Sequence, residues 1–322
     1  MAKIYVTRKI PKAGMDILRA AGHQVRAWPR ASAIPRKRLL KEVKGAHAVL
    51  TLLTDKIDDE FFMAAGLQLK IVANLAVGYD NFDLAAFKKR GVLAANTPGI
   101  LTAAVAEHAF ALMLACAKRV TEADRFTRAG KYKGWEPELL LGTELAGKTL
   151  GVIGLGRIGS QLVQRAVRGM DMKAMYYDVK RNEAVEKEYG AAYATVAGIL
   201  KDADVVSLHV PLLPTTRHLI DAKALKSMKR TAILINTSRG PVVDEKALVA
   251  ALKAGRIAYA GLDVYENEPK LAPGLAKLPN VVLTPHTASG TVETRSEMSR
   301  LAARAIVDAL AGKTPPNLIP LP

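Results

Sequence analysis

The sequence predicts an α/β protein with two doubly wound parallel-sheet domains, and three observations support this fold class. The chain has 322 residues, which at roughly 150 residues per domain corresponds to two domains. Short apolar runs of strand length recur, with helix-patterned segments between them that can serve as crossovers between parallel strands. This rhythm stops near residue 98 and restarts near residue 149, so we expect two sheets.

The first hundred residues contain three apolar runs that we interpret as strands. They cover residues 4–6, 47–53 and 70–75. Segments 14–21 and 82–90 carry apolar residues at helical spacing and are expected to be crossover helices. The sequence Asn96-Thr97-Pro98-Gly99 is typical of a turn and is suited to a hinge. We therefore end the first domain there.

The second half begins with a mostly apolar helix from about Thr102 to Lys118, followed by a loop rich in glycine, proline and charge up to Gly147. Six further strands then complete a full doubly wound sheet. They are predicted at residues 149–153, 173–177, 204–209, 231–236, 258–263 and 281–284. The tail from residue 293 to 310 has helical spacing with no strand after it, and it can pack back on the first domain.

Composition restricts the class of protein. Half of the residues are hydrophobic and 24% are charged, a balance typical of a packed globular protein. The single cysteine, Cys116, lies in an apolar run and is expected to be a buried thiol, which fits a reducing cytoplasm. No apolar stretch reaches the roughly 18 residues needed to span a bilayer, and the amino terminus resembles a strand rather than a signal peptide. We expect a cytoplasmic protein without a membrane segment.

The formal net charge of +17 raises the question of a nucleic-acid partner. The basic residues are spread along the whole chain, however, and the clusters at 36–38 and 88–90 are short and lack interleaved aromatic residues. We therefore expect no specific nucleic-acid binding. A positive field can concentrate small anionic substrates and nucleotides, and a solvated basic surface without function is the simpler interpretation.

A glycine-rich sequence follows the predicted strand 149–153 directly and opens a predicted helix. It reads Gly154-Leu155-Gly156-Arg157-Ile158-Gly159. In this setting Gly154 permits a tight turn, Gly156 lets the backbone approach a pyrophosphate, and Gly159 allows close packing of helix on strand. The helix amino terminus offers unpaired N–H groups to phosphates. The spacing and its context predict a dinucleotide-binding site.

Asp178 follows the second strand of this sheet, at the expected distance of about 20 residues from the glycine-rich loop. Its carboxylate can accept hydrogen bonds from the ribose hydroxyls of adenosine and would repel a 2′-phosphate, which favours NADH over NADPH. Lys180 and Arg181 lie next to it and can soften this preference. The alternative is that Asp178 only caps the next helix.

Three later strands end in side chains that form a chemical set: Arg239, Glu268 and His286. Ligands of open α/β sheets bind at the carboxyl ends of the strands, so the three can converge near the nicotinamide. Arginine can hold a carboxylate in a bidentate fork, histidine can exchange a proton near neutral pH, and glutamate can orient the histidine. Taken singly, each has a structural alternative, namely a surface ion pair, a solvated turn residue and a core histidine.

The other histidines are not accompanied in the sequence by a similar set of charged residues at strand ends, and they are expected to be structural. They are His23, His47, His108, His209 and His218. The chain also lacks the Cys/His spacing of a metal site, and no metal is expected.

Together these motifs resemble the D-isomer-specific 2-hydroxyacid dehydrogenase family. The resemblance rests on the glycine-rich loop, on segments 236–244, 261–269 and 284–286, and upstream on 77–83, 96–99 and 105–107. It implies a Rossmann cofactor domain, residues 99–288, inserted in a flavodoxin-like substrate domain made of residues 1–98 and 289–322. Members of the family are usually homodimers that pair through the cofactor domain, with the region 102–146 as the arm.

The resemblance also implies roles for individual residues. Arg239 would bind the substrate carboxylate and carbonyl oxygen, Glu268 would pair with the histidine, and His286 would donate the proton in reduction. Backbone amides at Val77 and Gly78 would hold the carboxylate. For the cofactor, the family pattern adds to the glycine-rich loop and Asp178 the residues Thr102, His209, Val210, Pro211, Thr216, Thr237, Asp263 and His286.

One departure from the family pattern narrows the substrate. Leu53 stands in the substrate site where some members have an arginine that grips a phosphate, which disfavours a phosphorylated substrate. The best likeness over the whole chain is to glyoxylate/hydroxypyruvate reductases. We therefore expect NAD-dependent reduction of small 2-keto acids. Two alternatives stay open, a D-lactate-type dehydrogenase for bulkier 2-keto acids and a corepressor-like protein that uses the dinucleotide as a structural ligand.

Overall fold

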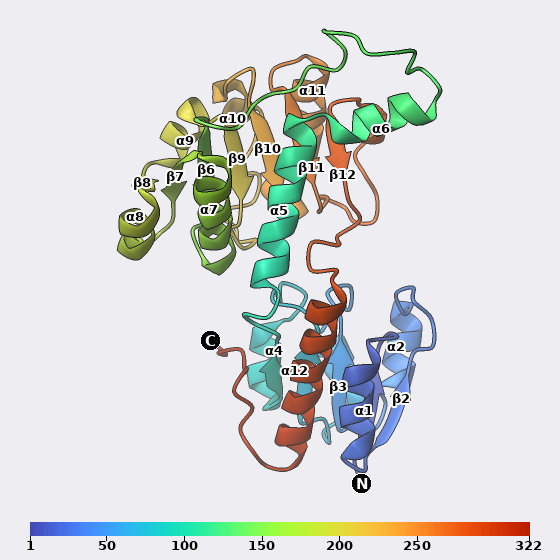
Figure 1. The fold of residues 1–322 in the computed structure, drawn as a ribbon. Helices are drawn as coiled ribbons and strands as arrows, with labels where there is room; N and C mark the ends of the chain where they lie inside the picture. Colours follow the sequence, from blue (N-terminus) through green and yellow to red (C-terminus); the bar gives the residue numbers. More distant parts are fainter. The chain divides into compact units, whose positions relative to one another are not determined.

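The computed structural model describes residues 1–322 and divides into two compact units. Unit 1 comprises Met1–Leu101 together with Gly290–Pro322, and unit 2 is the continuous segment Thr102–Ser289. Each unit contains one sheet whose strands are all parallel, with helices packed against it (Figure 1). The fold class predicted from the sequence is therefore confirmed.

Unit 1 has a five-stranded sheet in the order β2-β1-β3-β4-β5, the order of flavodoxin-like sheets. The strands are β1 (Lys3–Val6), β2 (Gln24–Ala27), β3 (Ala48–Thr51), β4 (Ile71–Asn74) and β5 (Leu93–Ala95). Apolar runs predict β1, β3 and β4. They do not predict β2, an edge strand with mostly exposed residues, or β5, which has three residues.

The helices of unit 1 include the carboxy-terminal tail of the chain. They are α1 (Lys12–Ala20), α2 (Arg36–Glu42), α3 (Asp59–Ala65), α4 (Leu84–Arg90) and α12 (Val292–Leu310). Helix α12 packs on α1 and against β3 and β4. A Cβ atom at Gly14 would lie 2.6 Å from the backbone oxygen of Ser299, so the two helices approach closely. The tail thus packs on the first domain, as the sequence suggested.

Unit 2 has a seven-stranded sheet in the order β12-β11-β10-β9-β6-β7-β8, a Rossmann order extended by one strand. The strands are β6 (Thr149–Ile153), β7 (Lys173–Tyr177), β8 (Ala192–Tyr193), β9 (Val205–Leu208), β10 (Ile233–Asn236), β11 (Tyr259–Leu262) and β12 (Val281–Leu283). All six predicted strands are present. The additional strand β8 consists of only two residues, both exposed, which is too short for a pattern in the sequence.

The order of the strands reverses between β6 and β9, which pair side by side. Ligands of doubly wound sheets bind at such a switch point, outside the carboxyl ends of the strands. The glycine-rich loop follows β6, so the chain topology brings the predicted cofactor motif to this point.

Seven helices surround this sheet. They are α5 (Thr102–Ala117), α6 (Val120–Arg128), α7 (Arg157–Met170), α8 (Glu183–Tyr189), α9 (Val196–Asp202), α10 (Ala222–Ser227) and α11 (Glu245–Lys253). The prediction of a loop from the end of α5 to Gly147 is wrong over α6. None of the residues of α6 is buried, and Val120 and Phe126 are its only large apolar residues, so the apolar pattern that marks a helix in a sequence is weak here.

The predicted burial of Cys116 is confirmed. The thiol lies in the core of unit 2 with no exposed surface, and burial raises its pKa to about 12. A thiol with this pKa is protonated at neutral pH and is therefore a poor nucleophile. None of the helices combines the length and apolar character needed to cross a membrane.

Candidate active site

The glycine-rich loop between β6 and α7 is packed too tightly for side chains at two of its glycines. Gly154 has a φ of +96°, and a Cβ atom there would lie 2.7 Å from the backbone carbon of His209. At Gly159 a Cβ atom would lie 2.4 Å from the backbone oxygen of Gly154, so α7 begins close against β6. Gly156 differs, because open space surrounds the position of its absent Cβ atom. The loop thus has free space at the glycine predicted to face a pyrophosphate.

The residues around this loop fit a dinucleotide. Gly156 is the N-cap of α7 and no side chain caps the helix, so N–H groups of its first turn can bind phosphate oxygens. Across the sheet, the hydroxyl of Thr237 is buried without a hydrogen-bond partner, an exception that a bound ligand would relieve. Thr102, another predicted cofactor residue, is the first residue of α5.

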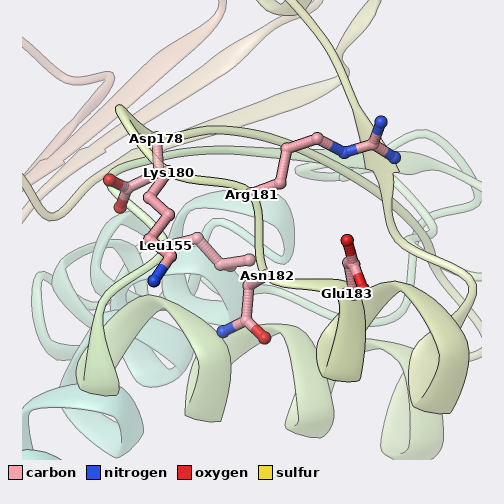
Figure 2. Close-up of a pocket in the computed structure, with 6 residues that line it drawn as sticks. All are labelled: Leu155, Asp178, Lys180, Arg181, Asn182 and Glu183. Carbon is pink, nitrogen blue, oxygen red and sulfur yellow. The ribbon is translucent and has the colours of Figure 1, made fainter.

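A pocket of about 610 Å³ adjoins the loop at the end of β7. Figure 2 shows the residues that line it, which are Leu155, Asp178, Lys180, Arg181, Asn182 and Glu183. Helix α8 is capped by Asn182, whose side chain accepts a hydrogen bond of 3.3 Å from the N–H of Val185. Asp178 is therefore not the cap of this helix, and its carboxylate is available to the pocket.

The segment after β9 lies beside the same loop. The Nε2 atom of His209 is 2.8 Å from the hydroxyl of Ser207, and burial lowers the pKa of His209 to about 4. The ring is thus neutral at neutral pH. Thr216 donates a hydrogen bond of 2.7 Å to the carbonyl of Pro211 and accepts one from the N–H of Leu213, so it shapes this turn. Contact of Thr216 with a cofactor stays a prediction.

His286 and Glu268 form a direct pair. Nδ1 of His286 lies 2.8 Å from Oε2 of Glu268. Oε1 of the same carboxylate accepts a hydrogen bond of 3.1 Å from the N–H of Tyr265. Burial raises the pKa of Glu268, but the hydrogen bond and the charge of His286 lower it more, so this pKa lies below its ordinary value. An ionised carboxylate therefore holds one nitrogen of the imidazole ring.

Arg239 follows β10 and lies close to this pair, and its positive charge contributes to the lowered pKa of Glu268. Its carbonyl accepts a hydrogen bond of 3.0 Å from the side chain of Asn236. A Cβ atom at the next residue, Gly240, would lie 1.9 Å from the backbone of Tyr265. Only glycine allows the segment that carries Arg239 to pack on the segment that leads to Glu268.

Asp263 holds the loop that carries His286. Its carboxylate is fully buried and accepts hydrogen bonds from the hydroxyl of Thr284 at 2.6 Å and from the N–H groups of Thr287 and Ala288, each at 2.8 Å. Burial raises the pKa of Asp263, but hydrogen bonds from His108, Thr284 and the backbone lower it more, so the pKa lies below its ordinary value. The predicted contact of Asp263 with a cofactor stays a prediction.

Two histidines expected to lack acidic neighbours have them. Nε2 of His108 lies 3.4 Å from Oδ1 of Asp263, and Nε2 of His218 lies 2.7 Å from Oε1 of Glu266. His108 therefore belongs to the network that supports the His286 loop. No signal in the sequence could have found it, because more than a hundred residues separate α5 from the end of β11.

The predicted substrate residues of unit 1 follow its central strands. Leu53 comes after β3, and Val77 and Gly78 come after β4. The carbonyl of Val77 accepts a hydrogen bond of 2.7 Å from Asn96, and that of Gly78 one of 3.0 Å from Asn74. The N–H groups of Val77 and Gly78 make no hydrogen bond within the protein, which leaves them available to an anionic ligand.

Comparison with known proteins is consistent with this geometry. The family profile described as "D-isomer specific 2-hydroxyacid dehydrogenase, NAD binding domain" matches residues 110–288. A glyoxylate reductase of Thermococcus litoralis is 48% identical over 321 residues, which cover 98% of this chain and 96% of that protein.

Two solved structures share the whole fold. The structure of a protein from Thermus thermophilus superposes with a TM-score of 0.93 at 42% identity, covering 99% of this chain and 100% of that one. The NADPH-dependent glyoxylate/hydroxypyruvate reductase of Sinorhizobium meliloti, solved with NADP and malonate, gives a TM-score of 0.86 at 31% identity, covering 99% of this chain and 96% of that one.

Proposed function

Since the chain belongs to the D-isomer-specific 2-hydroxyacid dehydrogenase family, we propose that it reduces glyoxylate and hydroxypyruvate to the 2-hydroxy acids with NADH. Membership of this family makes it an oxidoreductase with a dinucleotide-binding domain. The observation that carries the proposal is the 2.8 Å contact between His286 and Glu268, with Arg239 close enough to lower the pKa of the same carboxyl. In this proposal His286 is the proton donor, Glu268 is its charged partner, and Arg239 is the cation that binds the substrate carboxylate.

A dinucleotide held by the glycine-rich loop and the amino terminus of α7 would supply the hydride for the carbonyl carbon of the substrate. His286 enters as imidazolium, keeps its Nδ1–H on Glu268 and donates its Nε2–H to the carbonyl oxygen as negative charge develops there. Arg239 binds the substrate carboxylate in a fork of two N–H groups and thereby orients the carbonyl. His286 is then neutral and takes a proton from solvent before the next turnover.

Support for NADH over NADPH comes from the pocket after β7. The carboxylate of Asp178 lines it, and a 2′-phosphate there would face a like charge in a partly desolvated site. The uncapped amino terminus of α7 and the space beside Gly156 would hold the pyrophosphate.

The residues of unit 1 favour a small substrate without a phosphate. The free N–H groups of Val77 and Gly78 suit a carboxylate, and Leu53 supplies no charge for a phosphate. The proposal therefore keeps all three as substrate-binding residues.

We also propose that the chain forms a homodimer through unit 2 and works in the cytoplasm. The segment after α6 exposes three large apolar side chains, Tyr132, Trp135 and Leu141, and surfaces of this kind commonly mark protein contacts. The buried thiol of Cys116 suits a reducing compartment.

The test is the oxidation of NADH and of NADPH, followed by absorbance, with a panel of 2-keto acids. We expect turnover of glyoxylate and hydroxypyruvate, no turnover of glyoxal, which lacks the carboxylate, and a kcat/KM at least about tenfold higher with NADH. Preference for pyruvate or bulkier keto acids would support the D-lactate-type alternative. Binding of NADH without turnover of any 2-keto acid would support the corepressor-like alternative.

A further inference from the structure

We infer that Glu186 is a specificity-determining residue for the cofactor, because it holds the guanidinium of Arg181 away from Asp178, beside which a 2′-phosphate would lie. The inference rests on the proposed dinucleotide site. Arg181 lines the same pocket as Asp178, and an arginine in this place is the group expected to bind a 2′-phosphate. The contacts of the Arg181 guanidinium therefore decide whether it can bind the 2′-phosphate of NADPH.

Arg181 is bound by Glu186 at two points. Its Nε donates to Oε1 of Glu186 at 3.0 Å, and its Nη2 donates to Oε2 at 2.5 Å. Such a pair fixes orientation as well as distance. The guanidinium also lies over the ring of Tyr193, 5.4 Å from its centroid. Figure 2 shows the side chain of Arg181 leading away from Asp178 and Lys180.

Glu186 is itself anchored to the core of unit 2. Oε1 of Glu186 accepts a hydrogen bond of 2.5 Å from the hydroxyl of Tyr176, a fully buried residue of β7. The same hydroxyl accepts a hydrogen bond of 2.8 Å from the N–H of Asn182. Hydrogen bonds from Arg181 and Tyr176 lower the pKa of Glu186, so the carboxylate is ionised at neutral pH. Glu186 thus has a fixed position from which it can retain Arg181.

The pair of nucleotides that isolates this effect is 2′,5′-ADP and 5′-AMP, which differ only in the 2′-phosphate. Their dissociation constants are measured with the full chain by calorimetry. We expect Glu186→Gln to lower the dissociation constant for 2′,5′-ADP at least about tenfold, because Arg181 is released toward the 2′-phosphate. The dissociation constant for 5′-AMP should change by less than about twofold. Adding Arg181→Ala to this variant should abolish the gain.

Glu188→Gln is the matched control. Glu188 lies on the same helix and pairs with Arg168 at 2.8 Å, so the substitution makes the same change in net charge without touching Arg181. We expect it to leave both dissociation constants unchanged. An equal gain in Glu188→Gln and Glu186→Gln, or a gain that survives Arg181→Ala, would overturn the inference.

A further measurement does not require the Glu186 variant to fold. In the otherwise unaltered chain, Arg181→Ala should leave the affinity for 2′,5′-ADP unchanged, since Arg181 is held by Glu186. A loss of more than about fivefold would show that Arg181 already reaches the phosphate and would overturn the inference, while leaving the proposed function intact. If the unaltered chain binds neither nucleotide, this result would instead contradict the proposed dinucleotide site itself, and the inference with it.

Discussion

At the scale of single residues, the proposed reduction depends on the two ring nitrogens of His286. One is held by Glu268, which leaves the other for the substrate oxygen. We expect His286→Ala to lower kcat by about 10²- to 10⁴-fold while the dissociation constant for NADH changes little. Steady-state kinetics and NADH fluorescence titration measure the two quantities, and His23→Ala, a variant in unit 1, serves as the control. An active His286→Ala enzyme would remove the proton donor from the mechanism.

The partner of His286 determines how the reaction responds to pH. Glu268 is ionised at neutral pH, since its pKa lies below the ordinary value, and its charge stabilises the imidazolium form that donates the proton. Reduction should decline as falling pH protonates Glu268 through its lowered pKa, and Glu268→Gln, which carries no charge at any pH, should lack this decline. The profile of kcat/KM against pH for one 2-keto acid tests this. Superimposable profiles for the variant and the unaltered enzyme would exclude Glu268 from the relay.

Arg239 is expected to act through its shape as well as its charge. Arg239→Lys keeps the positive charge but loses the planar fork that binds a carboxylate at two points. We expect kcat/KM for glyoxylate to fall by more than about tenfold, the effect of a loss of about 1.4 kcal/mol. Retention of full kcat/KM in this variant would show that charge alone suffices and would contradict the proposed binding mode.

At the scale of elements, the loop after β12 depends on a buried carboxylate from the end of β11. Asp263→Ala would leave the N–H groups of Thr287 and Ala288 without their acceptor, and we expect it to lower the free energy of unfolding by about 3 kcal/mol at pH 7. The pKa of Asp263 is lowered in the folded protein, so the carboxylate stabilises the fold above its ordinary pKa of 3.8 and stops doing so as the pH falls through the lower folded value.

Urea denaturation of the two proteins at a series of pH values measures this dependence. The difference between them should be constant near neutrality and should shrink below about pH 4. A difference that does not change with pH would show that the loss comes from packing and not from the charge of Asp263.

The elements that the sequence predicts are those whose side chains are buried on a regular pattern. Strands β4 and β9 are fully buried and each contains only one polar residue, Asn74 and Ser207, so they appear as mostly apolar runs. The short strand β8 and helix α6, which has no buried residue, carry no such pattern, so only tertiary contacts reveal them.

In the candidate site, too, some features could be predicted from the sequence and others only from the folded structure. The glycine-rich loop and Asp178 follow from a motif of fixed spacing, which a sequence displays directly, whereas the pair of His286 with Glu268 is predicted from the ends of two strands and from the family resemblance. The contact of His108 with Asp263 and the hold of Glu186 on Arg181 depend on how side chains are directed after folding. The sequence contains the residues for both contacts but does not indicate that they meet.

At the scale of the whole molecule, the exposed segment after α6 is expected to mediate dimerisation. Sedimentation velocity should show a particle of twice the mass of the chain. The double substitution Trp135→Glu, Leu141→Glu should convert it to a monomer, because it places charges on an apolar contact surface. Leu67→Glu is the control, since Leu67 is also exposed but lies in unit 1. A monomeric unaltered chain would contradict the proposed homodimer.

The division of unit 1 between the two ends of the chain has a consequence for its biosynthesis. Strands β1 to β5 leave the ribosome first, but α12, which packs on β3 and β4, is translated only after the whole of unit 2. At about 5–20 residues per second this delay is on the order of ten seconds. Unit 2 can complete its core while the nascent unit 1 still exposes the apolar face of its sheet. The amino-terminal part of the chain is therefore the part that we expect a ribosome-associated chaperone to shield during translation.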